Sequence, residues 1–150
     1  MRSFVAIPLT PADIDAAFPL IQNLWPEHSL IDWRLFANQR LGSGQGGILG
    51  LRGESGHLNG LAIWRRASDL EHGLVLIVDY LVALDLVEPE KVASALVDGL
   101  ESLAKGCGAR AVQVTLPPTE TILLRPFLAA GHHLEGVKLC KAIGQAPVSR

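Results

Sequence analysis

The stretch from Gly73 to Gly108 constrains the fold most, because it combines a buried strand, a short acidic loop and a long helix. Leu74–Val78 is continuously apolar and rich in β-branched residues, as expected of a strand buried on both faces. Asp79 and Tyr80 interrupt this run, and Leu81–Leu84 resume it. We therefore predict one long strand with a polar break near its middle.

The helix of this stretch is amphipathic, and its ends are marked by proline and glycine. Pro89 suits the first turn, and Gly106 and Gly108 suit the end. A helix that begins just past the end of a strand can present free N–H groups to an anionic ligand. Its apolar residues recur at intervals of three and four, at Val92, Leu96, Leu100, Leu103 and Cys107.

Length and composition favour one soluble α/β domain. The chain has 150 residues, of which 49% are hydrophobic, and its mean hydropathy is +0.29. The formal net charge of −2 gives no electrostatic case for binding nucleic acid, which needs clustered Lys and Arg. Cys107 and Cys140 lack metal-site spacing and are expected to be buried or half-buried thiols, although a bond between them stays open. No run reaches transmembrane length, so we expect a cytoplasmic protein that does not enter membranes.

The first third of the chain reads as a strand and two helices. Thr10 starts the first helix, which Pro19 should kink or end early and Trp25-Pro26 should close. Ser29 and Asp32 have capping spacing for a second helix that runs to about Leu41. The preceding strand is expected at Ser3–Leu9.

The glycine-rich segment Gly42–Gly47, GSGQGG, contains the letters of a dinucleotide fingerprint in the wrong context. The fingerprint needs a strand before it and a helix after it, whereas here a helix precedes and the strand Ile48–Arg52 follows. We interpret it as a helix-to-strand connection. A hairpin turn at Gly53–Gly56 then leads into a strand at His57–Arg66, with a bulge or close approach at Gly60, and a polar loop at Ala67–His72.

The last third predicts a strand, a helix and a further strand region. The strand is predicted at Arg110–Leu116. The helix is expected to begin at a Thr119 cap, to be interrupted by Pro126 and to end at Gly131. The tail Leu134–Ile143 is predicted to form one or two strands. Residues 144–150 are expected to fray. The complete order predicts an α/β (α+β) fold with one mixed, mostly antiparallel sheet and helices on both faces.

This order resembles the GCN5-related N-acetyltransferase superfamily over about residues 3–143. The resemblance rests on Asp79–Ala83, the helix Val92–Gly108, the strand Ala111–Leu116 and the segment Phe127–His132. It implies that the strands before and after the helix splay apart and admit the pantetheine arm of acetyl-CoA. By this resemblance the backbone of Leu81, Val82 and Ala83 would hold pantetheine, and the helix start at Lys91, Val92, Ala93 and Ser94 would hold the pyrophosphate.

The chain departs from the family pattern at the phosphate loop. Glu88 stands where the family has a polar or cationic residue, and Lys91 stands where it has glycine. Pro89 offers no N–H, and Glu88 and Glu90 bring negative charge to a site meant for an anion. Lys91 is the one compensating cation. Phe127 replaces the tyrosine that protonates the thiolate in many members.

The candidate catalytic residues are Asp79 and Tyr80. Asp79 is the candidate general base for an amine, or else a carboxylate that hydrogen-bonds backbone at a strand bulge. Tyr80 would point to the opposite face if the strand is regular, and its alternative is a core or interface aromatic. His132 and His133 are expected at the surface, and no metal site is predicted. His28 lies between the first two helices, where the resemblance implies acceptor contacts. Trp25, Trp33 and Trp64 either line an acceptor pocket or anchor the core.

Two functions remain open at this level. The first is an acyl-CoA-dependent N-acyltransferase acting on a small-molecule or protein amine. The second is a non-catalytic module of the same fold, for binding, for regulation or for forming a homodimer through its C-terminal strands. Residues Glu88–Lys91 discriminate between them, because they decide whether the helix start still accepts an anion.

Overall fold

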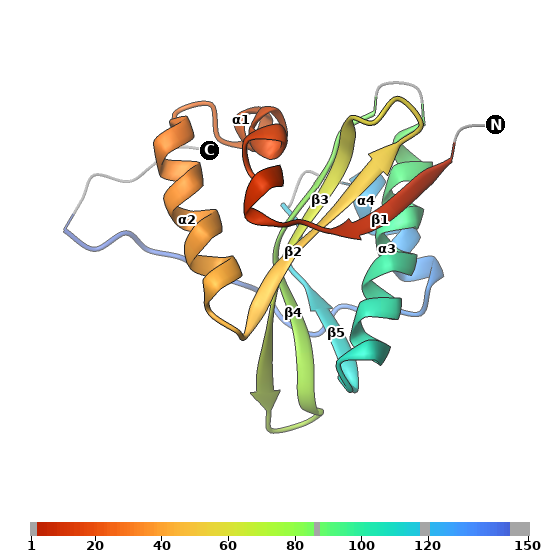
Figure 1. Cartoon of the computed structure of the whole chain (residues 1–150). Coiled ribbons are helices and arrows are strands. Elements are labelled where there is room, and N and C mark those ends of the chain that lie inside the picture. The colour runs from red at the N-terminus through yellow and green to blue at the C-terminus, as the bar shows by residue number, and fades with distance from the viewer. Residues whose placement is uncertain (1–2, 86–87, 118–120, 145–150) are drawn as a thin grey trace.

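A five-stranded sheet in the order β1-β2-β3-β4-β5 forms the centre of the molecule (Figure 1). The computed structural model describes residues 3–85, 88–117 and 121–144. The first four strands are antiparallel neighbours, and β5 pairs with β4 in parallel. This confirms the predicted mixed, mostly antiparallel sheet. The strands are β1 (Phe4–Pro8), β2 (Gly46–Gly53), β3 (Leu58–Asp69), β4 (Gly73–Ala83) and β5 (Ala111–Val114).

Helices cover both faces of the sheet, as predicted. One apolar cluster lies between the sheet and α1 (Phe18–Leu24) with α2 (Leu30–Gly42). The other lies between the sheet and α3 (Pro89–Gly106) with α4 (Thr121–Ala129). Burial of these two clusters is the main favourable term that holds the sheet between its helices.

The N-terminal helices follow the predicted caps with one correction. Ser29 Oγ accepts the Asp32 N–H at 3.1 Å and begins α2, while Trp25 ends α1. Pro19, however, does not kink or end a helix that begins at Thr10. It lies in the first turn of α1, where a missing N–H breaks no helical hydrogen bond, and two short 3-10 turns, Pro11–Asp13 and Asp15–Ala17, precede it.

Two connections around β2 also match the sequence. GSGQGG joins α2 to β2 with Gly44 at φ +73°, so it is a helix-to-strand turn. Gly60 is a close approach, since a Cβ there would lie 3.0 Å from Leu96 Cδ1 on α3. The expected polar loop after β3 is partly wrong, because β3 continues through Ala67–Asp69, which pair with Gly73–Val75 in an antiparallel hairpin.

The C-terminal third differs most from its prediction. Pro126 lies inside α4 without ending it, and Thr119 lies outside the described residues. Leu134–Ile143 forms no strand, because its backbone runs extended without a neighbouring strand to pair with in the part of the chain that the structure describes. Cys107 is a half-buried thiol at the end of α3, whereas Cys140 on this tail is exposed, contrary to expectation. Among the described helices none is both long and apolar enough to cross a membrane.

Replacement of Leu96 by alanine should strongly destabilise the fold. Leu96 is completely buried between α3 and the sheet. Leu96→Ala is expected to lower the free energy of unfolding by about 2–5 kcal/mol, through lost apolar burial and a residual cavity. Urea denaturation measures this loss. Asp98→Ala, at an exposed position on the same helix, is the matched control, and equal losses for both variants would contradict this account of α3 packing.

Candidate functional site

A β-bulge in β4 sets the geometry of the candidate site. Val78 lies opposite Trp64 on β3 and Tyr80 lies opposite Ile63, so Asp79 is an extra residue with no partner across the ladder. A bulge bends its strand and increases its twist. The polar break that the sequence shows at Asp79 and Tyr80 is thus a real irregularity of the strand.

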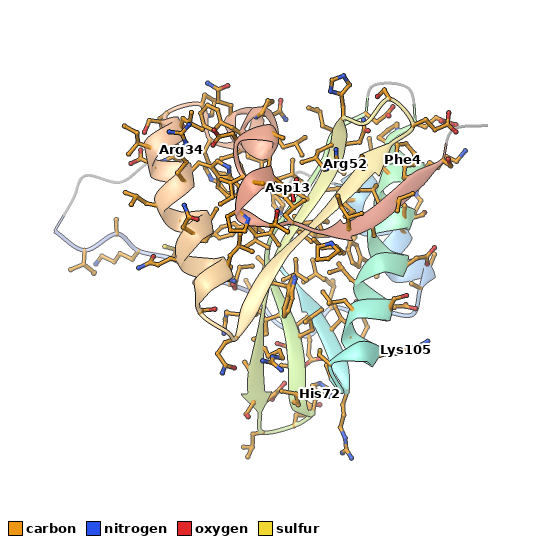
Figure 2. All side chains as sticks on the ribbon, viewed as in Figure 1. Phe4, Asp13, Arg34, Arg52, His72 and Lys105 are labelled. Carbon is orange, nitrogen blue, oxygen red and sulfur yellow. The ribbon has the colours of Figure 1, made fainter. Side chains whose placement is uncertain are left out.

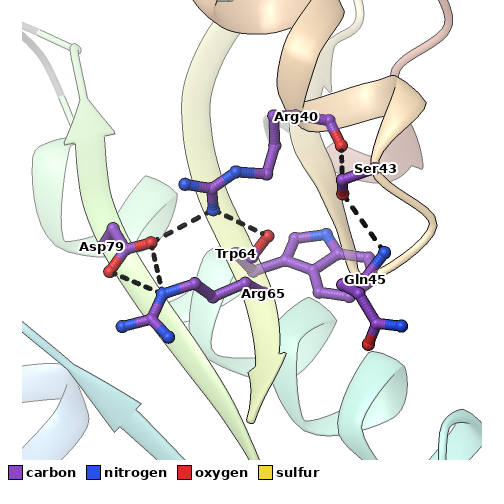
Figure 3. Close-up of polar contacts among 6 residues, drawn as sticks. All are labelled: Arg40, Ser43, Gln45, Trp64, Arg65 and Asp79. Atoms are coloured by element: carbon purple, nitrogen blue, oxygen red, sulfur yellow. Dashed lines mark hydrogen bonds and ion pairs between the residues drawn. The ribbon is translucent and has the colours of Figure 1, made fainter.

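The carboxylate of Asp79 is held by two arginines (Figure 3). Arg40 Nη1, from α2, donates to Asp79 Oδ2 at 3.1 Å and also to the Trp64 carbonyl at 3.1 Å. Arg65 Nε, from β3, lies 3.0 Å from Oδ2 and 3.3 Å from Oδ1. The side chains of Asp79 and Arg40 are only 19% and 17% exposed, so water screens this pair weakly.

These contacts bear on both expectations for Asp79. It does sit at a bulge, but its partners are guanidinium groups and not the backbone. Both carboxylate oxygens already accept charge-assisted hydrogen bonds, so accepting a proton from an amine would require release of an arginine. The sequence reasoning missed Arg40 altogether, because nothing in the linear spacing of residues 40 and 79 indicates that they meet.

Asp79 and Tyr80 face the same side of the sheet, which corrects the expectation of opposite faces. Val78 and Leu81 are both buried on the α3 side, although strict alternation would separate them. The extra residue shifts the alternation, so the two side chains between them both meet α2. Asp79 contacts Arg40, and the Tyr80 ring packs edge-on against Phe36 at 5.9 Å and against Trp25 at 5.1 Å.

Beyond the bulge, β4 and β5 separate. Their ladder extends only from Val75 to Val78 on β4, and the Thr115 N–H to Val78 O hydrogen bond is the last link between them in the described segments. Leu81, Val82 and Ala83 pair with β3 alone. The side chains of Leu81 and Val82 are buried in opposite cores. Only the backbone of this segment is therefore placed to bind a ligand in the gap.

The start of α3 lies beyond this gap, and its first amides are largely used. The Glu88 N–H donates to Asp85 Oδ1 at 2.7 Å, and Pro89 has no N–H. The N–H groups of Lys91 and Val92 both bond to the Glu88 carbonyl, at 3.2 and 3.3 Å. Glu90 is the remaining amide of the first turn. The helix start thus offers fewer donors than an anion site usually does.

The side chains around the start of α3 partly neutralise one another. Lys91 Nζ lies 3.8 Å from Glu88 Oε1, so the one cation of the loop is paired with a carboxylate of the same loop. Glu90 turns toward α4 and forms an exposed ion pair with Arg125 at 3.3 Å. Each of the two glutamates is therefore paired with a cation, so neither adds an unpaired negative charge beside the gap.

The remaining residues predicted to hold the pyrophosphate at this helix start differ in how exposed they are. Val92 and Ala93 are buried in the core, which leaves only their backbone, whereas Ser94 is exposed. Phe127, which stands at the family's tyrosine position, is also buried and packs edge-on against His132 at 5.1 Å. No hydroxyl comes to the gap from this position.

A pocket of about 540 Å³ opens on the α1–α2 side of β4. It is mainly apolar and aromatic, and Asp32 supplies its one carboxylate among the described residues. The Ser29 backbone N–H bonds to this carboxylate and lowers the pKa of Asp32, which keeps it ionised at neutral pH. Its lining residues are Ile21, Trp25, His28, Asp32, Trp33, Leu35, Phe36, Ile63 and Tyr80.

Comparison with known proteins adds structural neighbours only. No family model and no curated protein matches the sequence. The aminoglycoside N-acetyltransferase AAC(6')-Iy, solved with CoA, superposes with a TM-score of 0.80 at 16% identity, covering 95% of this chain and 97% of that one. A ribosomal-protein-alanine N-acetyltransferase from Brucella melitensis gives 0.73 at 16% identity, covering 96% and 100%. A transcriptional regulator from Bacillus halodurans gives 0.77 at 12% identity, covering 93% and 100%.

The chain has the GCN5-related N-acetyltransferase fold. This confirms the fold that the sequence resemblance implied. The resemblance assigned the acyl donor to the backbone of Leu81–Ala83 beyond the last β4–β5 pair and to the start of α3, and this assignment stays a prediction. The aromatic pocket lies between the first two helices, where the resemblance placed the acceptor.

A second polar cluster lies away from the β4 bulge, at the end of the β3–β4 hairpin (Figure 2). Ligand atoms of Asp69, His72 and Glu135 lie within 4.8 Å of one another. The Asp69 oxygens already accept hydrogen bonds, at 2.8 Å from Gln113 Nε2 and at 2.9 Å from the Glu71 N–H. We assign this cluster to an ion pair between His72 and Glu135 at 3.1 Å, which fastens the start of the C-terminal tail to the hairpin.

The Arg40–Asp79 contact should stabilise the fold more than an exposed ion pair does. Asp79→Asn leaves Arg40 and Arg65 without their carboxylate, and we expect the free energy of unfolding to fall by about 1–3 kcal/mol. Asp15→Asn is the control, since Asp15 binds Arg34 at 2.7 Å with both side chains well exposed and screened. Urea denaturation of both variants makes the comparison. Equal losses would mean that the bulge does not depend on its arginines.

The tail anchor should be sensitive to pH through His72. The hydrogen bond to Glu135, aided by the nearby carboxylates of Glu71 and Asp69, raises the pKa of His72. The ion pair therefore stabilises the anchor fully below the ordinary pKa of about 6.5 and loses this effect as pH rises through the higher folded value. NMR titration of the His72 ring should give a lower pKa in Glu135→Gln. An unchanged titration would remove Glu135 as the cause.

Proposed function

We propose that the protein is an acyl-CoA-dependent N-acyltransferase. The observation that carries the proposal is the separation of β4 from β5 beyond the bulge. Among the described residues, it leaves the backbone of Leu81–Ala83 unpaired on the β5 side, shortly before the start of α3. An extended pantetheine arm, with its amide groups, is suited to pair with such a strand edge. The CoA complex of a structural neighbour of the same fold supports this assignment.

In this proposal the pyrophosphate of acetyl-CoA lies at the first turn of α3. Lys91 contacts it as a point charge once it turns from Glu88, and the Glu90 N–H and the hydroxyl of Ser94 are the donors nearest the helix start. The backbone near Val92 and Ala93 completes the turn. The few free donors here predict weaker binding than a glycine-rich loop would give.

The amine acceptor in this proposal occupies the aromatic pocket. Trp25, Phe36 and Tyr80 offer apolar and aromatic surface, and ionised Asp32 offers a carboxylate to an ammonium group. The preferred acceptor is thus a small amine with an apolar or aromatic body. Tyr80 borders both the pocket and the bulge, so its ring orients the acceptor.

The acceptor must lose a proton before its nitrogen attacks the thioester. Asp79 is the acidic group of the bulge. We assign to it the role of proton acceptor, with a water molecule carrying the proton from the amine. Arg65, the more exposed of its two arginine partners, must first release one oxygen of the Asp79 carboxylate. Water serves the departing thiolate, since Phe127 has no hydroxyl. The bond between the amine nitrogen and the acyl carbon forms as the carbon–sulfur bond breaks.

One specific observation favours a second candidate, a non-catalytic binding module. The first turn of α3 has most of its amides engaged and its lysine paired, and both oxygens of Asp79 are occupied. A chain that no longer binds CoA would tolerate these features. The transcriptional regulator from Bacillus halodurans, whose solved structure is similar, shares the fold, which fits a regulatory or binding role.

Titration with acetyl-CoA and free CoA distinguishes the two candidates. Ligand at a hundred times its dissociation constant should raise the free energy of unfolding by about 2.7 kcal/mol, visible as a higher melting temperature. Lys91→Glu should abolish this shift, and Glu88→Gln should enlarge it by freeing Lys91. Lys105→Glu, at the other end of α3, is the matched charge control.

Calorimetry checks the stoichiometry, and an acetylation screen with aromatic amines then tests the acceptor. Asp32→Asn should raise KM for cationic acceptors while CoA binding is unchanged, because it removes the only carboxylate described in the pocket. Absence of any shift with millimolar CoA species would reject the transferase and leave the binding module.

A further inference from the structure

Two histidines and two carboxylates meet at the end of the β3–β4 hairpin, where the C-terminal tail begins (Figure 2). Ligand atoms of Asp69, His72 and Glu135 lie within 4.8 Å of one another. His133 adds a fourth group, with its Nε2 atom 3.6 Å from Glu135 Oε2. Asp69 and His72 belong to the hairpin, whereas His133 and Glu135 belong to the tail, so the cluster joins two segments that are distant in the sequence.

The atoms around Glu135 already have the spacing of metal ligands. Glu135 Oε1 and Oε2 lie 3.1 and 3.4 Å from His72 Nε2. Two ligands bound at about 2.0–2.1 Å in a tetrahedral zinc site are separated by about 3.3 Å. Asp69 must come closer by at most about 1.5 Å to reach this separation from the other two ligands. The His133 side chain is 76% exposed and is free to turn toward the same point.

The carboxylate of Asp69 is supported as a metal-binding carboxylate usually is. Its Oδ2 atom accepts a hydrogen bond from Gln113 Nε2 at 2.8 Å, and its Oδ1 atom accepts the Glu71 N–H at 2.9 Å. Each carboxylate oxygen has a second lone pair, so both hydrogen bonds can persist while one oxygen binds a cation. Such outer partners orient metal ligands and contribute to the affinity for the metal. The ion pair between His72 and Glu135 does not by itself explain why a supported Asp69 lies beside it.

The chemistry of the cluster favours a divalent transition metal such as Zn²⁺. Zn²⁺ accepts imidazole nitrogen together with carboxylate oxygen, whereas Ca²⁺ and Mg²⁺ take oxygen ligands. The carboxylates of Asp69 and Glu135 match the charge of one divalent cation. Glu71 Oε2, 3.8 Å from His72 Nε2, adds negative charge nearby. The side chains of His72 and Glu135 are 27% and 40% exposed, so the cluster is half-buried and open to an ion from solvent.

We propose that Asp69, His72, His133 and Glu135 form a zinc site that fastens the C-terminal tail to the β3–β4 hairpin. The ion pair of His72 with Glu135 is the metal-free form of this site, and zinc takes the place of the proton that the two side chains share. The proposal does not depend on the acetyltransferase assignment. The sequence contains no metal-binding motif for this site, because His72 and Glu135 are 63 residues apart.

Calorimetric titration of the full chain with ZnCl₂ tests the site. Cys107 and Cys140 are first changed to serine, because free thiols bind zinc themselves. We expect one zinc ion to bind per chain. Glu135→Gln and His72→Ala should each weaken binding by tenfold or more, because each removes a ligand.

Two further variants separate a built site from general attraction to surface charge. Gln113→Ala removes no ligand, but it should weaken zinc binding by about tenfold, because Asp69 loses its support. His57→Ala is the matched control for His72→Ala, because His57 is an exposed histidine outside the cluster, and it should leave the affinity unchanged. Replacement of zinc by Co²⁺ should give the strong visible absorption of a tetrahedral site, and His72→Ala should abolish it.

Three results would overturn the proposal. The first is a chain that does not bind zinc. The second is an unchanged affinity in Glu135→Gln, whose exposed position leaves folding intact, as its circular dichroism spectrum checks. The third is equal binding of Mg²⁺, which would show that the carboxylates attract any divalent cation without the imidazoles.

Discussion

The contact between Asp79 and two arginines is the interaction on which the rest of the candidate site depends. The extra residue in β4 would otherwise leave a carboxylate at a distorted point of a largely buried strand. Arg40 from α2 and Arg65 from β3 satisfy that carboxylate and join a helix, a strand and the bulge at one place. The bulge lies directly after the last β4–β5 pair and turns Tyr80 toward the aromatic pocket. The end of the ladder and the direction of Tyr80 thus coincide with one local irregularity whose charge is compensated.

The start of α3 shows a competition between a helix and its possible ligand. A helix N-terminus attracts negative charge from any source, including its own side chains. Here Asp85 accepts the Glu88 N–H, and Glu88 neutralises Lys91, so the chain itself supplies part of what a pyrophosphate would supply. The affinity for CoA under our proposal then depends on how readily these internal contacts yield. This places the distinction between a transferase and a binding module in a few residues, while the surrounding fold serves either.

Most of the fold was readable from the sequence because local patterns determine it. The apolar run at Leu74–Val78, the three-and-four spacing of α3 and the cap at Ser29 each specify an element without reference to distant residues. The site was less readable. A bulge shifts every later side chain to the other face, and nothing in the letters of Asp79 and Tyr80 reveals that shift. Arg40 meets Asp79 only through the folded packing of α2 on the sheet. The strand prediction for the tail Leu134–Ile143 was wrong for a related reason. Its alternating pattern is typical of a strand but does not show which strand it would pair with.

Helix α2 links two parts of the site through its own periodicity. Asp32 and Phe36 line the pocket and Arg40 holds the bulge, each one turn beyond the last, so the three lie along one stripe of a single rigid rod. The Arg40 guanidinium also lies 5.5 Å from the centre of the Phe36 ring, which ties the two contacts together. Under our proposal, acceptor recognition and the position of the bulge are therefore coupled through one helix. Divergence toward a new acceptor by shifting α2 would also alter the opening between β4 and β5, so evolutionary change is easier at α1 and the loop before α2 than along this stripe.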